Sequence, residues 1–337
     1  MSNNLYKCVY LLASLLIPLR EGFASPAAIS QFIKVDQFGY RTTDQKIAVI
    51  SDPQIGYNAP LSYTPGTAAS QYQLRNWSTN AVVYSGTLVP WHVGAIHDQS
   101  GDKVWWFDFS GVTTPGAYYV LDKATNKGSV RFEINNNVYQ NVMKAAVRMF
   151  YYQRAGFAKV APFVDPGFAD GASHLRPLQD LDCRLVNNGS IASSRNLSGG
   201  WYDAGDYNKY VNYAWDPVLD LLLAYEQKPG VWVDNYNIPE SGNGIPDLLD
   251  EVKIELDWLL KIQNADGSVL SVVGTEQYAS ASPPSADKAP RKYGPSTTQA
   301  SFSAAGMFAL ASVQFKAVGQ TAYAGTLKNA AVKAWNW

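Results

Sequence analysis

A change in hydrophobic period near residue 136 limits the possible folds of this 337-residue chain more than any other feature. Before that point, apolar residues form short β-rich runs such as KIAVIS (46–51) and GAYYVLD (116–122), separated by turn residues. After it, apolar residues recur every three or four positions, which is the period of an α-helix. Since strands and helices need different periods, the sequence predicts two domains, one all-β and one all-α.

The first domain is expected at residues 25–136. Seven β-rich runs follow one another there, and turn-forming stretches such as TPG (64–66) and TTPG (113–116) separate them. Short strands at this spacing, with no helical period between them, are typical of an antiparallel sandwich. We therefore predict a β-sandwich of the immunoglobulin-like kind.

Residues 1–24 have the pattern of an export signal. Lys7 precedes a 12-residue apolar run, and Gly22 and Ala24 supply small residues before a cut after Ala24. The run is shorter than the roughly 20 residues of a membrane-spanning helix, and a buried core helix is the alternative. We expect a secreted or periplasmic protein with no membrane partner after signal removal. Cys8 leaves with the signal, and Cys183 remains as the one thiol.

Residues 137–337 are expected to be helical. Apolar periodicity predicts five helices, at 138–156, 207–227, 244–263, 297–319 and 322–337. Pro217 lies inside the second of these and is expected to bend or split it. The connections 157–206 and 264–296 are long, and long connections on a helical scaffold often carry functional residues.

The charge balance argues against some classes of partner. Lys and Arg number 27, Asp and Glu number 28, and the net charge is -1. A protein that binds nucleic acid or an anionic membrane surface usually has a basic face, so neither partner is expected. Aromatic residues make up 13% of the chain. They can fill a core or form flat platforms for sugar rings, and composition does not separate these uses.

The stretch GGWYDAGDYNKYV (199–211) holds the candidate catalytic residues. Asp203 and Asp206 lie close together, and Gly205 allows a sharp bend between them. Three interpretations are open: Asp206 caps a helix that starts at Tyr207, the two aspartates bind calcium, or they act in catalysis. In an inverting glycosidase one carboxylate activates water while another carboxyl group protonates the leaving oxygen, and two aspartates can share the first task. The rings proposed to contact the sugar are Trp201, Tyr202, Tyr207 and Tyr210.

This stretch resembles the signature around the catalytic aspartates of glycoside hydrolase family 9, a cellulase family. MFYYQRAG (149–156), IPESGNGIPDLLDEVKIELDWLLKIQNADGSV (238–269) and APRKYGPSTTQASFSAAGMFALAS (289–312) are similar to further stretches of its catalytic domain. IKVDQFGY (33–40) begins a segment similar to the immunoglobulin-like domain that precedes it in one branch. The resemblance implies an (α/α)6 barrel of twelve helices, of which residues 137–337 hold about the first half.

The resemblance also implies roles for the two aspartates. By position, Asp206 is the catalytic base and Asp203 its partner in holding the water. The implied activity is that of an endo-β-1,4-glucanase that works with inversion, and the implied partner is a β-glucan such as cellulose. Xyloglucan, mixed-linkage glucan and amino-sugar oligomers are alternative substrates. The alternative functions are a non-catalytic glycan-binding protein, an inactive truncated relic, and a structural immunoglobulin-like adaptor with a degenerate tail.

The chain departs from the family pattern in its second half. The family's general acid is a Glu near the end of the catalytic domain, and a His-Arg motif for substrate lies in the same half; neither occurs before Trp337. The resemblance gives no catalytic role to Glu240 or Glu276, and Glu251 and Glu255 are expected on the solvated side of their helix or paired with neighbours. We therefore expect a fragment or a truncated copy that exposes apolar helix faces and does not hydrolyse glucan alone.

Zinc and calcium are the metals that the resemblance raises. Some relatives carry a zinc site just before the aspartates, and Ala155 and Ser173 stand where its thiol ligands are expected, so that only His174 remains. One His does not make a site, and we predict no zinc and no cofactor. Cys183 is expected to be a free thiol. Structural calcium occurs in the family, but the sequence does not locate its ligands in this segment.

Overall fold

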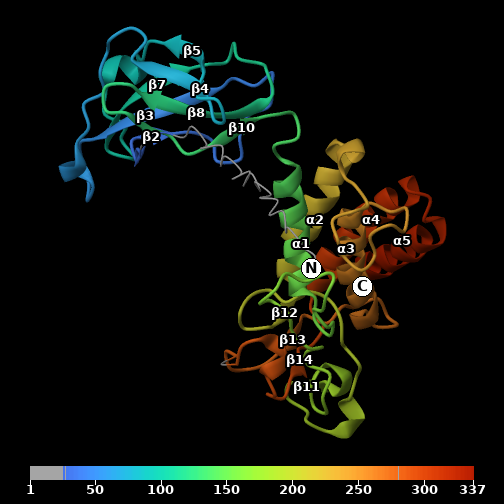
Figure 1. Cartoon of the computed structure of the whole chain (residues 1–337). Coiled ribbons are helices and arrows are strands. Elements are labelled where there is room, and N and C mark those ends of the chain that lie inside the picture. The colour runs from blue at the N-terminus through green and yellow to red at the C-terminus, as the bar shows by residue number, and fades with distance from the viewer. Residues whose placement is uncertain (1–25, 27, 280) are drawn as a thin grey trace, which may run out of the picture. The chain divides into compact units, whose positions relative to one another are not determined.

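The computed structural model describes residues 26, 28–279 and 281–337. The chain divides into two units between Val142 and Met143 (Figure 1). The expected export signal at 1–24 lies outside the described residues. Among the helices that the structure describes, none is long and apolar enough to cross a membrane.

Unit 1 is built from strands. They are β1 (Ala28–Ile29), β2 (Ile33–Lys34), β3 (Ile47–Pro53), β4 (Tyr72–Asn76), β5 (Val82–Gly86), β6 (Val89–Pro90), β7 (Asp102–Asp108), β8 (Gly116–Asp122), β9 (Lys127–Gly128) and β10 (Phe132–Ile134). One sheet has the order β1-β9-β8-β4-β5 with β10 also paired to β8, and the other has the order β2-β3-β7-β6. The pairs are antiparallel except β1 with β9.

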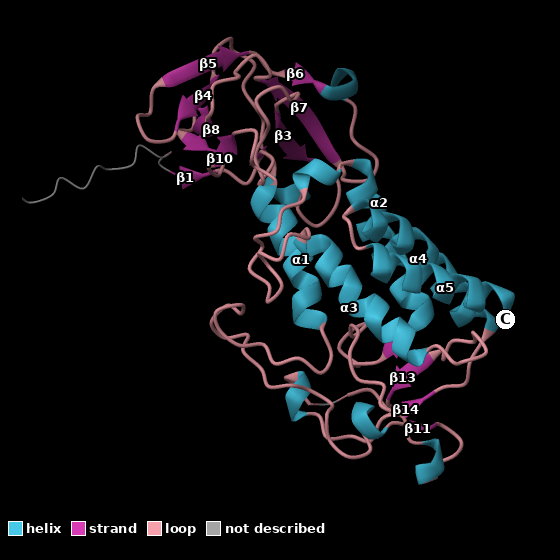
Figure 2. Ribbon diagram, turned by 90° about the vertical axis from the view of Figure 1, so that its right-hand side faces the viewer, coloured by secondary structure: helices cyan, strands magenta, loops and turns pink. Residues whose placement is uncertain are grey.

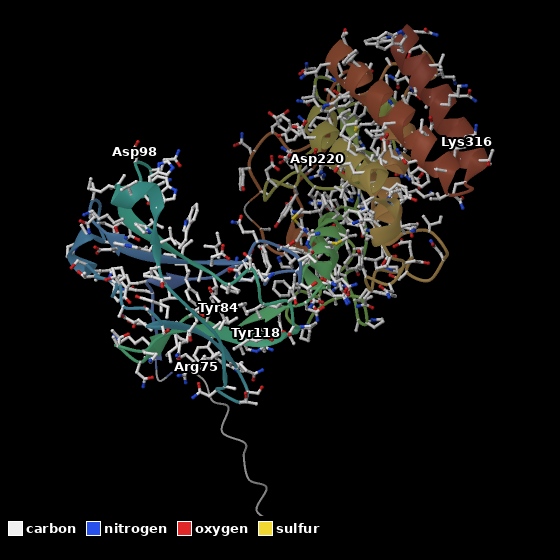
Figure 3. All side chains as sticks on the ribbon, turned by 90° about the horizontal axis from the view of Figure 1, so that it is seen from above. Arg75, Tyr84, Asp98, Tyr118, Asp220 and Lys316 are labelled. Carbon is white, nitrogen blue, oxygen red and sulfur yellow. The ribbon has the colours of Figure 1, made fainter. Side chains whose placement is uncertain are left out.

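The two sheets of unit 1 share one apolar core. Alternate residues of a strand point to opposite faces, and Ala48 and Ile50 of β3 are accordingly both fully buried. Phe107 of β7 and Tyr118 of β8 join the same core, and Figure 3 labels Tyr118 among the sandwich strands. The predicted two-sheet sandwich is therefore present.

Five α-helices are described from residue 140 onward. They are α1 (Gln140–Gln153), α2 (Val211–Gln227), α3 (Asp247–Ile262), α4 (Thr298–Ala317) and α5 (Thr321–Asn336). The existence and order of the five predicted helices are confirmed, and only α5 begins earlier than expected. Pro217 lies inside α2 without ending it.

The helices of unit 2 pack around a single core. Leu222 of α2, Leu256 of α3 and Phe308 of α4 are fully buried in it. Asp220 of α2 and Lys316 of α4, both labelled in Figure 3, are exposed on the outer faces. The helical period of the sequence thus separates core from surface as expected.

A small sheet in unit 2 was not predicted. It contains β11 (Arg184–Leu185), β12 (Lys209–Tyr210), β13 (Val272–Gly274) and β14 (Lys292–Tyr293), in the order β11-β14-β13-β12. These strands come from the segments predicted as long connections and from the residues before α2. Figures 1 and 2 both show the sheet at one end of the helices. The sheet places the segment that holds Asp203 and Asp206 at that same end.

An apolar face of unit 2 is open to solvent. Residues of α2, α4 and α5 line a hollow of about 340 Å³ there, namely Trp215, Phe302, Ala305, Gly306, Ala309, Ala331, Val332 and Trp335. Phe302 is 59% exposed and Trp335 70%. This is the exposed apolar helix face that the sequence predicted.

Candidate functional site

The loop of residues 202–208, called here the aspartate loop, connects the end of a buried segment to β12. Asp203 is exposed and Asp206 is half-buried. Oδ1 of Asp206 accepts a hydrogen bond from the Asn208 backbone N–H at 3.1 Å, and Oδ2 accepts one from the Tyr210 hydroxyl at 3.2 Å. The carboxylate of Asp206 is therefore oriented by two donors, one in the loop and one in β12 directly after it.

The interpretation of Asp206 as a helix cap is wrong. Helix α2 begins at Val211, and the residue before it, Tyr210, provides no side-chain cap. Residues 209–210 instead pair with β13 in the small sheet, with Lys209 opposite Val273. This pairing delays the helix by four residues and leaves both aspartates in a loop.

The environment of Asp203 perturbs its titration. Partial burial raises the pKa of the Asp203 carboxyl above its ordinary value, and the nearby negative charge of Asp206 raises this pKa further. A carboxylate with a raised pKa holds a proton more strongly than an ordinary aspartate. Two carboxylates that interact in this way are suited to hold and deprotonate a water molecule.

The start of the aspartate loop is fixed by a buried carboxyl group. Glu255 of α3 accepts a hydrogen bond from the Trp201 backbone N–H at 2.6 Å, and the carbonyl of Gln153 accepts one from Tyr202 N–H at 2.9 Å. Burial raises the pKa of Glu255 to about 7. The expected solvated position of Glu255 is therefore wrong, because its side chain is used to fix the loop.

The other glutamates of the segment also have defined partners. The Arg154 guanidinium donates to Glu251 from Nε at 3.0 Å and to Glu240 from Nη1 at 3.0 Å. Glu251 is fully buried, so it is not solvated, and its ion pair with Arg154 agrees with the alternative of a paired position. Glu276 pairs with Lys292 at 2.8 Å. Glu240 and Glu276 thus both lie in ion pairs.

The four rings predicted to contact the sugar differ in how much of their surface is exposed. Trp201 and Tyr202 are buried, with 6% and 3% of their surface exposed, whereas Tyr207 and Tyr210 are half-buried. The Trp201 ring packs against Phe150 at a centroid distance of 4.7 Å. A cavity of about 210 Å³ beside the loop is lined by Asp203, Tyr210, Trp201 and Tyr202 with residues of α1, α2 and α3. Of the four rings, Tyr207 and Tyr210 are the more accessible.

Ser173 and His174 both contact Tyr202, the first residue of the aspartate loop. The Tyr202 hydroxyl is within 2.6 Å of Ser173 Oγ and also contacts Nδ1 of His174. Nε2 of His174 lies 3.1 Å from Oδ2 of Asp287. Burial, and next the charge of Arg291, lower the pKa of His174. Both ring nitrogens of His174 are therefore used in contacts with protein side chains.

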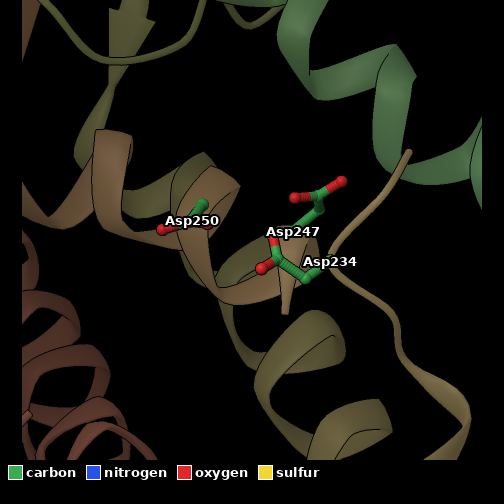
Figure 4. A group of neighbouring side chains, drawn as sticks. All are labelled: Asp234, Asp247 and Asp250. Atoms are coloured by element: carbon green, nitrogen blue, oxygen red, sulfur yellow. The ribbon is translucent and has the colours of Figure 1, made fainter. Parts of the chain in front are cut away.

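Three aspartates form a separate cluster at the start of α3, shown in Figure 4. Asp234, Asp247 and Asp250 each offer one carboxylate oxygen, and these oxygens lie within 4.8 Å of one another. Asp234 already accepts hydrogen bonds from the backbone N–H groups of Gly242 and Gly244, both at 2.6 Å. Asp247 is fully buried, and its Oδ1 has no hydrogen-bond partner. Hard oxygen ligands and an unpartnered buried carboxylate oxygen suit a cation such as Ca²⁺.

Sequence reasoning missed these buried charges and the calcium-type cluster. Asp180 contacts both Lys209 and Arg291 below the aspartate loop, at 2.7 Å and 2.6 Å. Asp180 and Arg291 lie in segments predicted as connections, and Lys209 lies in a predicted helix. Charged residues spread over such segments give no signal of their contacts, because the contacts join positions far apart in the chain.

Family models match both halves of the chain. The model for glycosyl hydrolase family 9 matches residues 139–337, and the model for the cellulase N-terminal ig-like domain matches residues 29–127. These matches agree with the predicted order of an immunoglobulin-like domain followed by a family 9 segment.

The chain is similar to characterised proteins and to a solved structure. It is 35% identical to Endoglucanase D of Acetivibrio thermocellus, over 56% of this chain and 28% of the relative. It is 32% identical to a xyloglucan-specific endo-beta-1,4-glucanase of Bacteroides ovatus, over 70% of this chain and 37% of the relative. A crystal structure of a metagenome-derived glycoside hydrolase family 9 endoglucanase matches with a TM-score of 0.75 and 32% identity, over 90% of this chain and 53% of that one. The chain thus spans about half of that structure and less of the two relatives.

Proposed function

Since this chain belongs to glycosyl hydrolase family 9, we propose that it provides the water-activating side of an active site that hydrolyses β-1,4-glucan. Asp206 is the base and Asp203 helps to hold the water. The observation that carries this proposal is the pair of neighbouring carboxylates on a loop fixed by buried groups beside a cavity. The raised pKa of Asp203 supports a close interaction between the two aspartates.

The proposed reaction is a single displacement with inversion. Water attacks the anomeric carbon, Asp206 takes one proton of that water, and the bond to the leaving oxygen breaks as a general acid protonates it. Asp203 accepts a hydrogen bond from the other O–H of the water, which stays on the product as its new hydroxyl, and keeps the water aligned with the carbon. Tyr207 in the loop and Tyr210 just after it, the more accessible of the four rings, are proposed to contact the sugar. Trp201 and Tyr202 are buried and support the loop by packing against the protein interior.

The general acid is proposed to come from the part of the family domain that this chain does not span. Within the described residues, Glu240 and Glu251 are bound to Arg154, Glu255 to the Trp201 N–H, and Glu276 to Lys292. The exposed apolar face of α2, α4 and α5 is proposed to pack against further helices of an (α/α)6 barrel. This chain alone is then expected to bind glucan and not to cleave it.

The substrate class is proposed to be a β-1,4-linked glucan, with cellulose first and xyloglucan as the alternative. An endoglucanase and a xyloglucan-specific glucanase are both among the similar proteins. Hydrolysis of carboxymethyl cellulose and of xyloglucan by the native protein, meaning the protein as its cell produces it with any part of the family domain beyond this chain, separates the two when measured as reducing sugar. Secretion and the export signal at 1–24 remain predictions.

The test of the proposed function compares two substitutions. In the native protein, Asp206→Asn should lower turnover by at least roughly 100-fold, which is the lower range for loss of a general base. The affinity for a cello-oligosaccharide, measured by calorimetry, should stay within a few-fold. Asp220→Asn is the control, because Asp220 is an exposed aspartate of α2 outside the loop. Near-normal turnover of the Asp206 variant would place the base elsewhere. Glucan binding without turnover in the native protein would favour a non-catalytic glycan-binding role.

A further inference from the structure

We propose that Arg291 is a positioning residue for the catalytic base, and that buried Asp180 holds Arg291 in place for this task. Arg291 does not contact the reacting atoms in this account; it acts through the backbone of the aspartate loop. The inference rests on the proposed function, because the base that it positions is Asp206.

The guanidinium of Arg291 bridges an acidic group and the aspartate loop. Its Nε donates to Oδ1 of Asp180 at 2.6 Å, and its Nη2 donates to the backbone carbonyl of Tyr207 at 2.7 Å. The side chain of Arg291 is fully buried. Because Nε and Nη2 belong to one planar guanidinium and both form hydrogen bonds, the position of the Tyr207 carbonyl is fixed relative to that of Asp180.

Asp180 also holds the far end of the loop. Its Oδ2 accepts from Nζ of Lys209 at 2.7 Å, and Lys209 Nζ also donates to the carbonyls of Leu197 and Gly199, at 2.8 Å and 2.9 Å. The side chain of Lys209 is fully buried and that of Asp180 is 2% exposed. The Asp180 carboxylate therefore forms ion pairs with two cations. They are Lys209, which directly follows the aspartate loop, and Arg291, which contacts the Tyr207 carbonyl.

The residue held by Arg291 has an unusual backbone conformation. Tyr207 has a φ of 56°, in the left-handed region that residues with a side chain adopt rarely. It directly follows Asp206, and the turn around it is closed by a bond from Tyr207 N–H to the Ala204 carbonyl at 3.1 Å. The Asn208 N–H that orients Asp206 belongs to the same peptide group as the Tyr207 carbonyl. The bond from Arg291 thus stabilises the conformation that directs the Asp206 carboxylate.

Loss of this bond should affect chemistry more than substrate binding. Without the guanidinium the Tyr207–Asn208 peptide is free to turn, and the N–H that orients Asp206 turns with it. A displacement of a catalytic group by about 1 Å is enough to reduce turnover by roughly 100-fold. The rings of Tyr207 and Tyr210 and the cavity remain, so the affinity for glucan changes little.

The substitution Arg291→Lys tests the proposal in the native protein. A lysine retains the positive charge that Asp180 needs. Its single ammonium group cannot reproduce the two hydrogen bonds that the planar guanidinium forms with Asp180 and the Tyr207 carbonyl. Asp180→Asn is less suitable, because it leaves two buried cations without a counter-charge and is strongly destabilising. The readouts are kcat and KM on a cello-oligosaccharide, and hydrogen exchange of peptides covering 199–211 and α3.

Arg148→Lys is the matched control. Arg148 is another buried arginine of the helical part, and its Nη2 donates to the backbone carbonyl of Phe163 at 2.9 Å, away from the aspartate loop. In Arg291→Lys we expect kcat to fall at least roughly tenfold with KM within about threefold, as for misplacement of a reacting group. Exchange should become faster in 199–211 and stay unchanged in α3. In Arg148→Lys, kcat should stay near that of the wild type.

Four results would decide against the proposal or separate it from the proposed function. Unchanged kcat in Arg291→Lys would overturn it, and so would an equal loss of kcat in Arg148→Lys with faster exchange throughout the protein. If the native protein does not cleave any glucan, the function proposal fails. The exchange measurement then still reports whether Arg291 orders the aspartate loop, and unchanged exchange in 199–211 would overturn that as well.

Discussion

Replacement of Glu255 by Gln should make the protein more stable at alkaline pH, although it removes a charged group that forms a hydrogen bond. Glu255 is 1% exposed and accepts the Trp201 N–H at 2.6 Å. Burial raises its pKa from an ordinary value of 4.5 to about 7, whereas the attraction of Lys209 and the Trp201 N–H oppose the rise. A glutamine keeps an acceptor oxygen in the same place and carries no charge.

The sign of the effect follows from proton linkage. The folded state binds a proton at Glu255 more tightly than the unfolded chain does, so stability from this group is fully present below pH 4.5 and is lost as pH rises through about 7. At 1.36 kcal/mol for each pKa unit, the full difference is about 3 kcal/mol. For a domain of this size that corresponds to roughly 6 to 12 °C in unfolding temperature.

The assay is thermal unfolding of wild type and Glu255→Gln from pH 5 to pH 8. The two should unfold at similar temperatures near pH 5, and the variant should be the more stable at pH 8. Glu226→Gln, at an exposed glutamate of α2, serves as the control and should follow the wild type. The reasoning is refuted if the gap between wild type and the Glu255 variant does not change with pH, or if the wild type becomes the more stable as pH rises.

Three further predictions follow from the site. Because the pKa of Asp203 is raised above its ordinary 3.8, kcat/KM of the native protein should fall with acid at a pH above 3.8; an acidic limb at or below that value would contradict it. Calorimetry should detect Ca²⁺ binding that Asp247→Asn weakens at least several-fold, and Ca²⁺ should raise the unfolding temperature; no heat and no shift in the wild type would count against the cluster. Cys183 is fully buried, and burial raises its pKa to about 12, so a thiol reagent should label it slowly until urea unfolds the protein; fast labelling of folded protein would show that the burial is wrong.

The parts of the fold that depend on local periodicity could be predicted from the sequence. Helix α3 was expected at 244–263 and is found at Asp247–Ile262, because its apolar residues recur on one face. The start of α2 could not be predicted in the same way. Its first expected turn is instead a left-handed Tyr207 followed by strand β12, and this strand exists only because β13, more than sixty residues later, pairs with it.

Of the charged residues of the site, too, only those whose role depends on local sequence could be predicted. Asp203 and Asp206 stand close together in the sequence, so a site at this loop could be proposed from residue types and spacing. For Glu255 the sequence predicts a solvated or paired position, because glutamate is usually exposed. Its burial depends on the Trp201 N–H, which lies 54 residues away in the chain. Contacts of this range are set by tertiary packing and leave no periodic pattern to detect.

The central claim is that Asp206 and Asp203 activate a water molecule that attacks the sugar directly. The most direct measurement is the anomeric form of the first product released from a β-1,4-glucan oligosaccharide by the native protein, followed by proton NMR before mutarotation. A single displacement by activated water inverts the configuration, so the account predicts the α-anomer. Initial release of the β-anomer would mean a covalent intermediate on a carboxylate, and would contradict the assignment of Asp206 as a base.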